Sequence, residues 1–101
     1  MARIAFYHEV ADGKRDEYRE IHEDVPDDLE AAYRSAGLEL FSLFEKDGFV
    51  FGYIEVTDPA ALKETMAESD VQAAWSEQTL PLLKELPDDI WMDEIYRLEP
   101  A

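Results

Sequence analysis

The sequence has no cysteine, and its nine lysines and arginines stand against twenty-five aspartates and glutamates. Without cysteine, the chain forms no disulfide, no thiolate nucleophile and no cysteine-ligated metal site. Its formal net charge of -16 repels nucleic-acid phosphates and anionic lipid headgroups. We therefore expect neither nucleic acid nor a membrane as a partner.

Several motifs of known chemistry are also missing. The chain has no glycine-rich phosphate loop and no Gly-x-Ser-x-Gly elbow, so nothing supports phosphoryl transfer or serine hydrolase chemistry. The first ten residues, MARIAFYHEV, lack the apolar run of a signal peptide or membrane helix. A cytoplasmic location is the resulting expectation.

The residues that are present can form a core. With 47% hydrophobic and 12% aromatic residues among 101, we expect one compact domain over residues 1–101. The acidic residues are spread along the whole chain, and lysine occurs only four times. This surface is typical of proteins from salt-loving organisms, so a halophilic source is our hypothesis.

Four segments have the pattern of β-strands. In residues 3–10, Ile4, Phe6, His8 and Val10 alternate with Ala5, Tyr7 and Glu9. Residues 38–45 and 49–56 are rich in strand formers, and the Asp47-Gly48 pair between them predicts a hairpin. After a break at 87–89, alternation over residues 90–98 predicts a final strand.

Helices are predicted between these strands. Apolar spacing of three and four runs from Tyr18 to Ala36, with an interruption at Pro26 and an end at Gly37. Asp58 is the predicted N-cap of a helix that begins at Pro59. Ser69 and Asp70 cap a last helix over 71–86, which includes Leu83 and Leu86 on its apolar side and a kink at Pro81.

The order β-α-β-β-α-β predicts an α+β protein of the ferredoxin-like class, an antiparallel sheet with helices on one face. The middle strands carry large apolar residues on both faces, Phe41 and Leu43 on one and Leu40 and Phe44 on the other. An uncovered apolar sheet face is a liability in a soluble monomer. We therefore predict a homodimer that joins sheet to sheet.

Tyr18 and His22 are the first candidates for chemistry. On a helix, residues four apart lie one turn apart on the same face, so the phenol and the imidazole are neighbours. Histidine moves protons near neutral pH, and tyrosine can orient a hydroxylated ligand. The alternative is that both are residues at the edge of the core, with polar tips that reach water or backbone.

Three other residues admit two interpretations each. His8 is either a core histidine or a member of the same interior pocket. Trp75 is either a core residue or a stacking surface for a sugar, and Trp91 fits packing or a dimer contact better than a site. The two histidines and nearby carboxylates match no metal-ligand spacing, so we predict no metal.

Six short stretches, in register from Arg3 to Leu98, carry a resemblance to a known family: AFYHEV, EYREIH, DLEAAYRSAG, LFSLFEKDGFVFGYIEV, SDVQAAW and DEIYRLE. By these stretches the sequence resembles the L-rhamnose mutarotase family, small dimeric proteins with an α+β-barrel fold.

The resemblance implies a sugar isomerase that needs no cofactor and takes L-rhamnose or a similar sugar as its small-molecule partner. By position, it makes His22 the proton donor, with Tyr18 and Trp75 as sugar-contacting residues. From its place in the first strand, we add His8 as a weaker candidate for the pocket. Where the family has a sugar-contacting tyrosine and a second tryptophan, this chain has Phe41 and Ser76. These two departures leave the identity of the sugar open.

The stretch after the histidine also departs from the family, because Trp-Pro-Glu-Leu becomes residues 25–29, VPDDL.

Two rival functions remain. The dimeric barrel also fits a cofactor-free monooxygenase or a haem-binding protein. A small binding module, in which Tyr18 and His22 only hold a ligand or a core, is the second rival.

Overall fold

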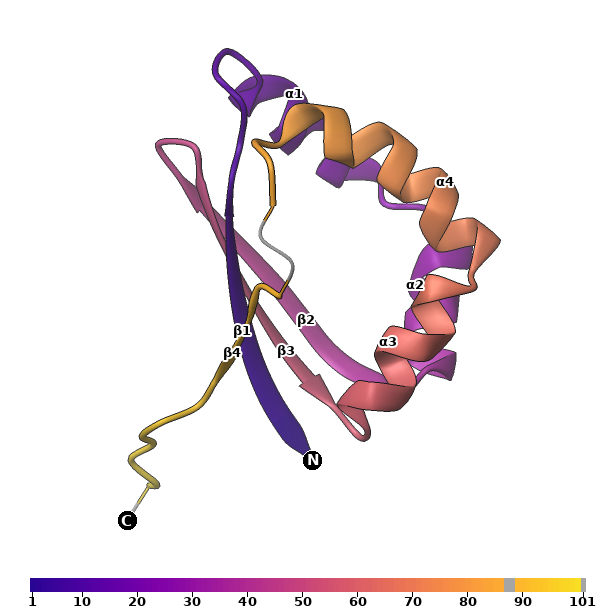
Figure 1. Ribbon diagram of the computed structural model, residues 1–101, viewed down its shortest axis with the longest axis vertical. Helices are drawn as coiled ribbons and strands as arrows, with labels where there is room; N and C mark the ends of the chain where they lie inside the picture. Colours follow the sequence, from indigo (N-terminus) through magenta and orange to yellow (C-terminus); the bar gives the residue numbers. More distant parts are fainter. Residues whose placement is uncertain (87–88, 101) are drawn as a thin grey trace.

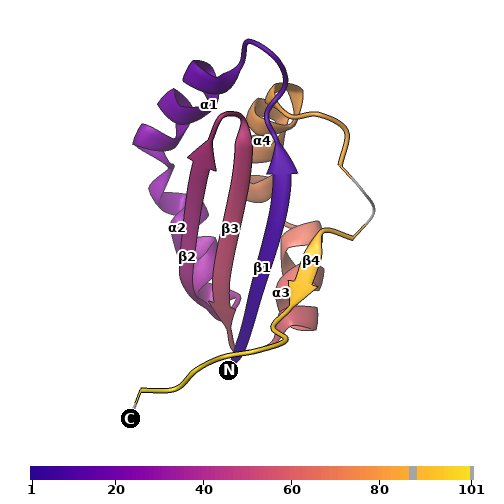
Figure 2. The same cartoon turned by 90° about the vertical axis from the view of Figure 1, so that its left-hand side faces the viewer.

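The computed structural model describes residues 1–86 and 89–100. Its sheet has the order β2-β3-β1-β4, and every neighbouring pair is antiparallel. The helices all lie over one face of the sheet (Figure 1), and the opposite face is bare (Figure 2). This arrangement confirms the predicted ferredoxin-like α+β class. The strands are β1 (Ala2–Glu9), β2 (Leu38–Lys46), β3 (Phe49–Val56) and β4 (Trp91–Asp93), and the helices are α1 (Arg15–Ile21), α2 (Asp27–Ser35), α3 (Pro59–Ala67) and α4 (Asp70–Thr79).

The local signals in the first two thirds of the chain act as predicted. Pro26 separates α2 from a short 3-10 turn, His22–Asp24, that follows α1. Asp47 and Gly48 both have positive φ in the β2–β3 hairpin, the conformation that an Asp-Gly turn favours. Ser69 Oγ caps α4 by accepting from the backbone N–H of Gln72 at 3.2 Å.

The C-terminal third departs from the prediction. Helix α4 ends at Thr79, because Pro81 cannot donate a backbone hydrogen bond, and a 3-10 turn over Leu80–Leu82 follows. Leu83 is extended and pairs with Val10, so the predicted helix over 71–86 is too long. Of the predicted break at 87–89, residues 87 and 88 lie outside the described residues.

The last strand is shorter than predicted. Only Trp91–Asp93 pair with β1, in a register that sets Asp93 opposite Ile4. Beyond Asp93, the antiparallel register leaves only the first few residues of β1 as partners, so most of residues 94–98 has no strand to pair with. Ile95 is consequently 97% exposed, which makes the predicted strand over 90–98 wrong in its second half.

The core between the sheet and the helices is divided into two clusters. One gathers around Phe6, Ile54 and Leu62, and the other around Val10, Tyr18 and Val50. Leu43 packs against both. The inward face of β1 carries Phe6, which is buried, and that of β2 carries Leu43, which packs on the core. Within the described residues, no helix is long and apolar enough to cross a bilayer.

Gly52 is the point at which β3 makes room for the ring of Phe6. A Cβ added to Gly52 would lie 2.1 Å from Phe6 Cζ, so Gly52→Ala must displace the ring. We expect the variant to lose about 1–3 kcal/mol of unfolding free energy, measured by urea titration. Combination with Phe6→Leu should relieve part of this loss, and strictly additive losses would contradict the steric explanation.

Candidate active site

His22 lies where α1 passes into the 3-10 turn, and its imidazole is held by the backbone. Its Nδ1 lies 2.7 Å from the carbonyl oxygen of Tyr18. Because a carbonyl only accepts, Nδ1 must carry the proton and donate. The other ring nitrogen, Nε2, is then left with a lone pair that can take up a proton and return it.

Tyr18 is 5% exposed and lies one turn before His22, with the two ring centroids 4.5 Å apart. Burial raises the pKa of its phenol to about 12. The hydroxyl group therefore stays protonated at neutral pH. It lies 3.1 Å from Nε2 of His8, across from α1 on the inward face of β1.

His8 lies behind Tyr18. Burial lowers the pKa of His8, and His22 lowers it further, so the imidazole stays neutral near pH 7. Its Nδ1 is buried without a partner among the described residues. A proton on Nδ1 would be an unpaired buried donor, so we assign the proton to Nε2, where it is donated to the oxygen of Tyr18.

Aromatic rings continue from this trio along the inner wall. The Trp75 ring, on α4, meets His22 edge to face with centroids 5.3 Å apart. Consecutive centroids lie 4.5–6.0 Å apart along the whole arc. We call this set the aromatic arc: Tyr33, Phe41, Phe6, His8, Tyr18, His22 and Trp75.

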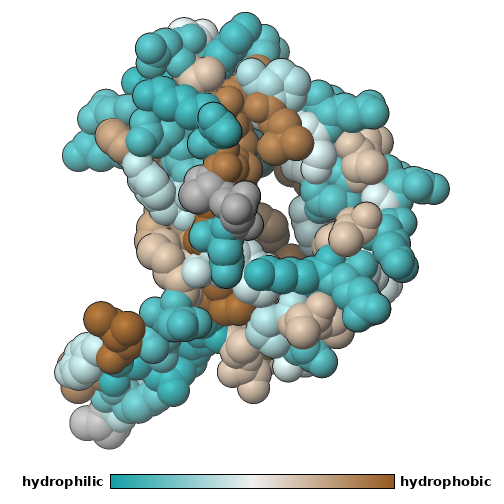
Figure 3. Space-filling model, viewed as in Figure 1, coloured by the Kyte–Doolittle hydropathy of each residue, from teal (hydrophilic) through white to brown (hydrophobic). Residues whose placement is uncertain are grey.

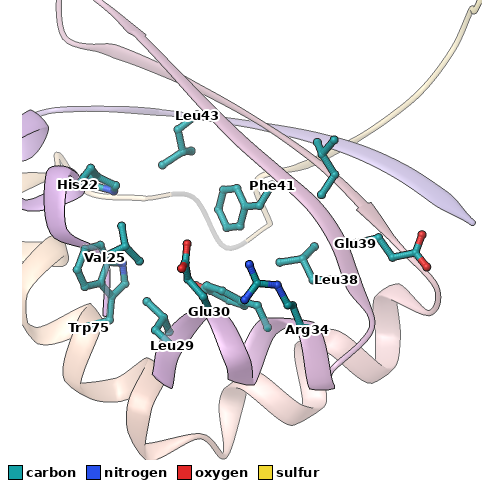
Figure 4. Close-up of a pocket in the computed structure, with 12 residues that line it drawn as sticks. His22, Val25, Leu29, Glu30, Arg34, Leu38, Glu39, Phe41, Leu43 and Trp75 are labelled. Atoms are coloured by element: carbon teal, nitrogen blue, oxygen red, sulfur yellow. The ribbon is translucent and has the colours of Figure 1, made fainter. Parts of the chain in front are cut away.

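A hollow of about 410 Å³ opens between β2 and the helices beside this arc. His22, Trp75 and Phe41 line it, with Val25 and Leu29 below (Figure 4). Figure 3 shows the opening between the sheet layer and the helical layer. A mostly apolar hollow of this size with a few polar groups is typical of a small-molecule site.

Three predicted residues, Tyr18, Ser76 and His8, do not line the main hollow. Tyr18 and His22 line an adjoining hollow of about 380 Å³, near the β2–β3 hairpin. Ser76 lines a second hollow, of about 520 Å³, which Phe41 also borders. His8 lines none of these three hollows and touches the site through Tyr18.

Sequence reasoning missed polar residues on α2. Glu30 and Arg34 extend from α2 at the main hollow (Figure 4). Tyr33, on the same helix, also lines this hollow. Tyr33 follows Leu29 by four residues and precedes Ala36 by three, so its place on the inner side of the helix was readable from the periodicity. Among the described residues, no group of three or more histidines and carboxylates is placed to hold a metal.

Glu45 anchors the hairpin end of β2 to α1. Hydrogen bonds from Arg15, then from the Gly48 backbone N–H and from Arg19, lower the pKa of Glu45 to about 2. The arginines hold α1, which carries Tyr18 and leads into His22, against the sheet. The Glu45 carboxylate is thus a structural support of the site.

Because the folded pKa of Glu45 lies below its unfolded value near 4.3, its stabilisation is present above that value and is lost as the pH falls towards 2. We expect Glu45→Gln to be less stable than the wild type at pH 7. The difference in unfolding free energy should shrink between about pH 4.5 and pH 2. Glu20→Gln, an exposed change on α1, is the control, and a difference that does not vary with pH would contradict the assignment.

Residues 3–98 match the family model described as L-rhamnose mutarotase. The chain belongs to the L-rhamnose mutarotase family. An L-rhamnose mutarotase from Listeria monocytogenes is 28% identical over 91 residues, which cover 88% of this chain and 86% of that one. The one from Bacillus subtilis is 31% identical over 85 residues, covering 82% and 78%.

Solved structures agree on the fold. The crystal structure of an L-rhamnose mutarotase from Formosa agariphila superposes with a TM-score of 0.81 at 19% identity, over 98% of this chain and 100% of that one. The crystal structure of an antibiotic biosynthesis monooxygenase superposes with a TM-score of 0.67 at 12% identity, covering 95% of this chain and 100% of that one. Membership of the L-rhamnose mutarotase family makes this protein an enzyme that acts on carbohydrates, of the isomerase class.

Proposed function

We propose that the protein interconverts the α and β anomers of L-rhamnose or a closely related sugar, with His22 as the proton-transferring residue. The observation that carries the proposal is the tethering of His22. Its Nδ1 is fixed to the carbonyl of Tyr18, which leaves Nε2 beside a sugar-sized hollow. Membership of the L-rhamnose mutarotase family supports the choice of sugar.

Mutarotation transfers one proton off the sugar and one onto it. The anomeric hydroxyl on C1 loses its proton, the ring oxygen gains one, the C1–O bond of the ring breaks and C1 becomes a carbonyl. Rotation about the C1–C2 bond turns the carbonyl, and the reverse steps close the ring on its other face. No atoms or electrons are gained or lost, so the reaction requires no cofactor.

One imidazole nitrogen can serve both proton transfers, because the anomeric oxygen and the ring oxygen are both bonded to C1. We assign the two transfers to Nε2 of His22. Tyr18, kept protonated by burial and oriented by His8, donates to a sugar oxygen at the adjoining hollow, which Tyr18 and His22 both line. Trp75 and Phe41 supply the apolar walls, and Ser76 lies beyond them.

The test is two-dimensional NMR exchange between the α and β anomers of L-rhamnose, with other hexoses in parallel. Purified protein should raise the exchange rate in proportion to its concentration. Binding without faster exchange would instead identify a ligand-binding module. The visible absorbance spectrum of the purified protein tests the haem-binding alternative. The monooxygenase structures share the fold of this chain but only at low sequence identity.

We also propose that the protein is a homodimer joined through the bare face of the sheet. This face carries apolar side chains that are 40–62% exposed in the single chain. Its acidic residues are compensated within the chain, since Glu9 pairs with Lys84 at 3.0 Å and Glu55 lies 4.0 Å from Arg3. The exposed apolar residues on this face are Tyr7, Leu40, Phe44, Phe49, Phe51 and Met92.

A neutral apolar patch on a chain of net charge -16 is a surface that a second copy can approach. The two-fold symmetry of most homodimers requires a self-complementary patch, and a flat apolar sheet face meets that requirement. The dimer would cover the face that the helices leave bare (Figure 2).

A further inference from the structure

A second hollow adjoins the main one, at the end away from His22. Its volume is about 520 Å³, and it shares Tyr33, Leu38 and Phe41 with the main hollow. In Figure 4, His22 and Trp75 lie at one end of the main hollow and Leu38 at the other, with Phe41 between them. The two hollows therefore border each other at Tyr33 and Phe41, whose ring centroids lie 5.6 Å apart, and we call this border the waist.

A chain of hydrogen bonds crosses from α2 to α4 at this waist. The Tyr33 hydroxyl group donates to Oε1 of Gln72 at 2.6 Å, and Nε2 of Gln72 donates to Oγ of Ser76 at 3.0 Å. Neither bond uses a lone pair of the Tyr33 oxygen or the hydroxyl proton of Ser76. The waist thus offers one acceptor and one donor to an oxygen-bearing ligand.

The walls beyond the waist are apolar. Phe6, Ile54, Leu62 and Met66 line the second hollow, and burying a sugar hydroxyl against them would leave it unpaired. The ammonium group of Lys63 lies 3.8 Å from Asp89, so it is already compensated and favours no anion. Such a space favours an alkyl group attached through a single oxygen.

The orientation of the sugar follows from the chemistry at its other end. When C1 and the ring oxygen lie at His22, C3 and C4 lie on the far side of the pyranose ring. Phe41 and Leu38 lie across the main hollow from His22 (Figure 4), so this orientation places those carbons on the side of the waist.

We propose that the second hollow is a subsite for an O-alkyl group on O3 or O4 of a reducing deoxyhexose, with the free hydroxyl proton of Ser76 donated to the ether oxygen. The substrate class then includes O-methylated deoxysugars as well as the parent sugar. This inference rests on the proposed mutarotase function. Tyr33 on α2 and Gln72 on α4 then take part in substrate selection, because their hydrogen bonds form the waist and hold Ser76.

The test compares anomer exchange of L-rhamnose with that of its 3-O-methyl and 4-O-methyl ethers. The measured quantity is the kcat/KM of each ether divided by the kcat/KM of L-rhamnose. We expect the wild type to accept at least one ether with a ratio above about 0.3. Ala73→Leu places a larger side chain in the second hollow only, and this should lower the ratio at least about tenfold, the usual effect of steric exclusion by a few methylenes.

Ala74→Leu is the matched control, because the neighbouring alanine on α4 lines neither hollow and should keep the wild-type ratio. Rejection of both ethers by a wild type that exchanges L-rhamnose would overturn the subsite and leave the mutarotase function standing. Equal ratios in the wild type, Ala73→Leu and Ala74→Leu would also overturn the subsite and leave the mutarotase function standing. No acceleration with any sugar would overturn the proposed function, and the subsite with it.

Discussion

His22→Asn should lower the protein-catalysed rate of anomer exchange by about 10²–10⁴-fold, the usual contribution of a positioned acid–base group. Asparagine retains a side-chain N–H that can reach the carbonyl of Tyr18, as Nδ1 of His22 does at 2.7 Å. It has no nitrogen that can take up a proton in the place of Nε2. The substitution therefore removes the proton transfer while keeping the local hydrogen bond.

The rate is measured by NMR exchange at several protein concentrations, so that the uncatalysed exchange is subtracted. Glu20→Gln, on the exposed side of α1, is the control for charge and helix changes near the site. Far-UV circular dichroism and the midpoint of unfolding show whether the variant is folded. Sugar binding by His22→Asn, followed by line broadening, should persist because Tyr18 and Trp75 remain in place.

A folded His22→Asn protein that exchanges anomers at the wild-type rate would exclude His22 as the proton-transferring residue. In that case Tyr18, whose pKa of about 12 suits a donor and not a base at neutral pH, cannot replace it alone. The carboxylate of Glu30, at the edge of the main hollow, would be the next candidate.

Strong local signals made most of the fold predictable. Pro26, the Asp47-Gly48 turn and the Ser69 cap each act through the backbone of a few neighbouring residues, so a pattern in the sequence reports them directly. The length of the last strand depends on where β1 ends beside it. That limit is set by pairing between residues about ninety positions apart, which no local pattern contains.

The site was predictable in part for the same reason. Tyr18 and His22 are one helical turn apart, and their proximity follows from α1 alone. The polar chain from Tyr33 through Gln72 to Ser76 joins two helices from different parts of the sequence. Its members look like ordinary helix residues until the tertiary packing brings α2 beside α4.

Phe51→Glu should convert the proposed dimer into a monomer. Phe51 lies on the central strand β3, opposite Tyr7 on β1 and Phe44 on β2, so it occupies the middle of the bare apolar face. Two-fold symmetry would bring a new carboxylate from each copy into the interface. A buried charge without a partner costs about 3–5 kcal/mol, enough to weaken association by more than about 100-fold.

Light scattering after size exclusion measures the mass directly. The wild type should have twice the chain mass of 11.6 kDa, and Phe51→Glu should have the mass of one chain. The measurement is made at physiological and at molar salt, because screening reduces the repulsion between two chains of charge -16. If the variant is monomeric only at low salt, general repulsion and not the loss of the apolar contact explains the result.

Leu80→Glu is the matched control, since Leu80 is also an exposed apolar residue, 53% accessible, but lies in the turn after α4 and not on the bare face. It adds the same charge and should leave the dimer intact. A wild type with the mass of a single chain, or a dimeric Phe51→Glu, would show that the bare face does not join two copies. The apolar residues of the sheet would then need another cover, because their exposure in a lone chain favours aggregation.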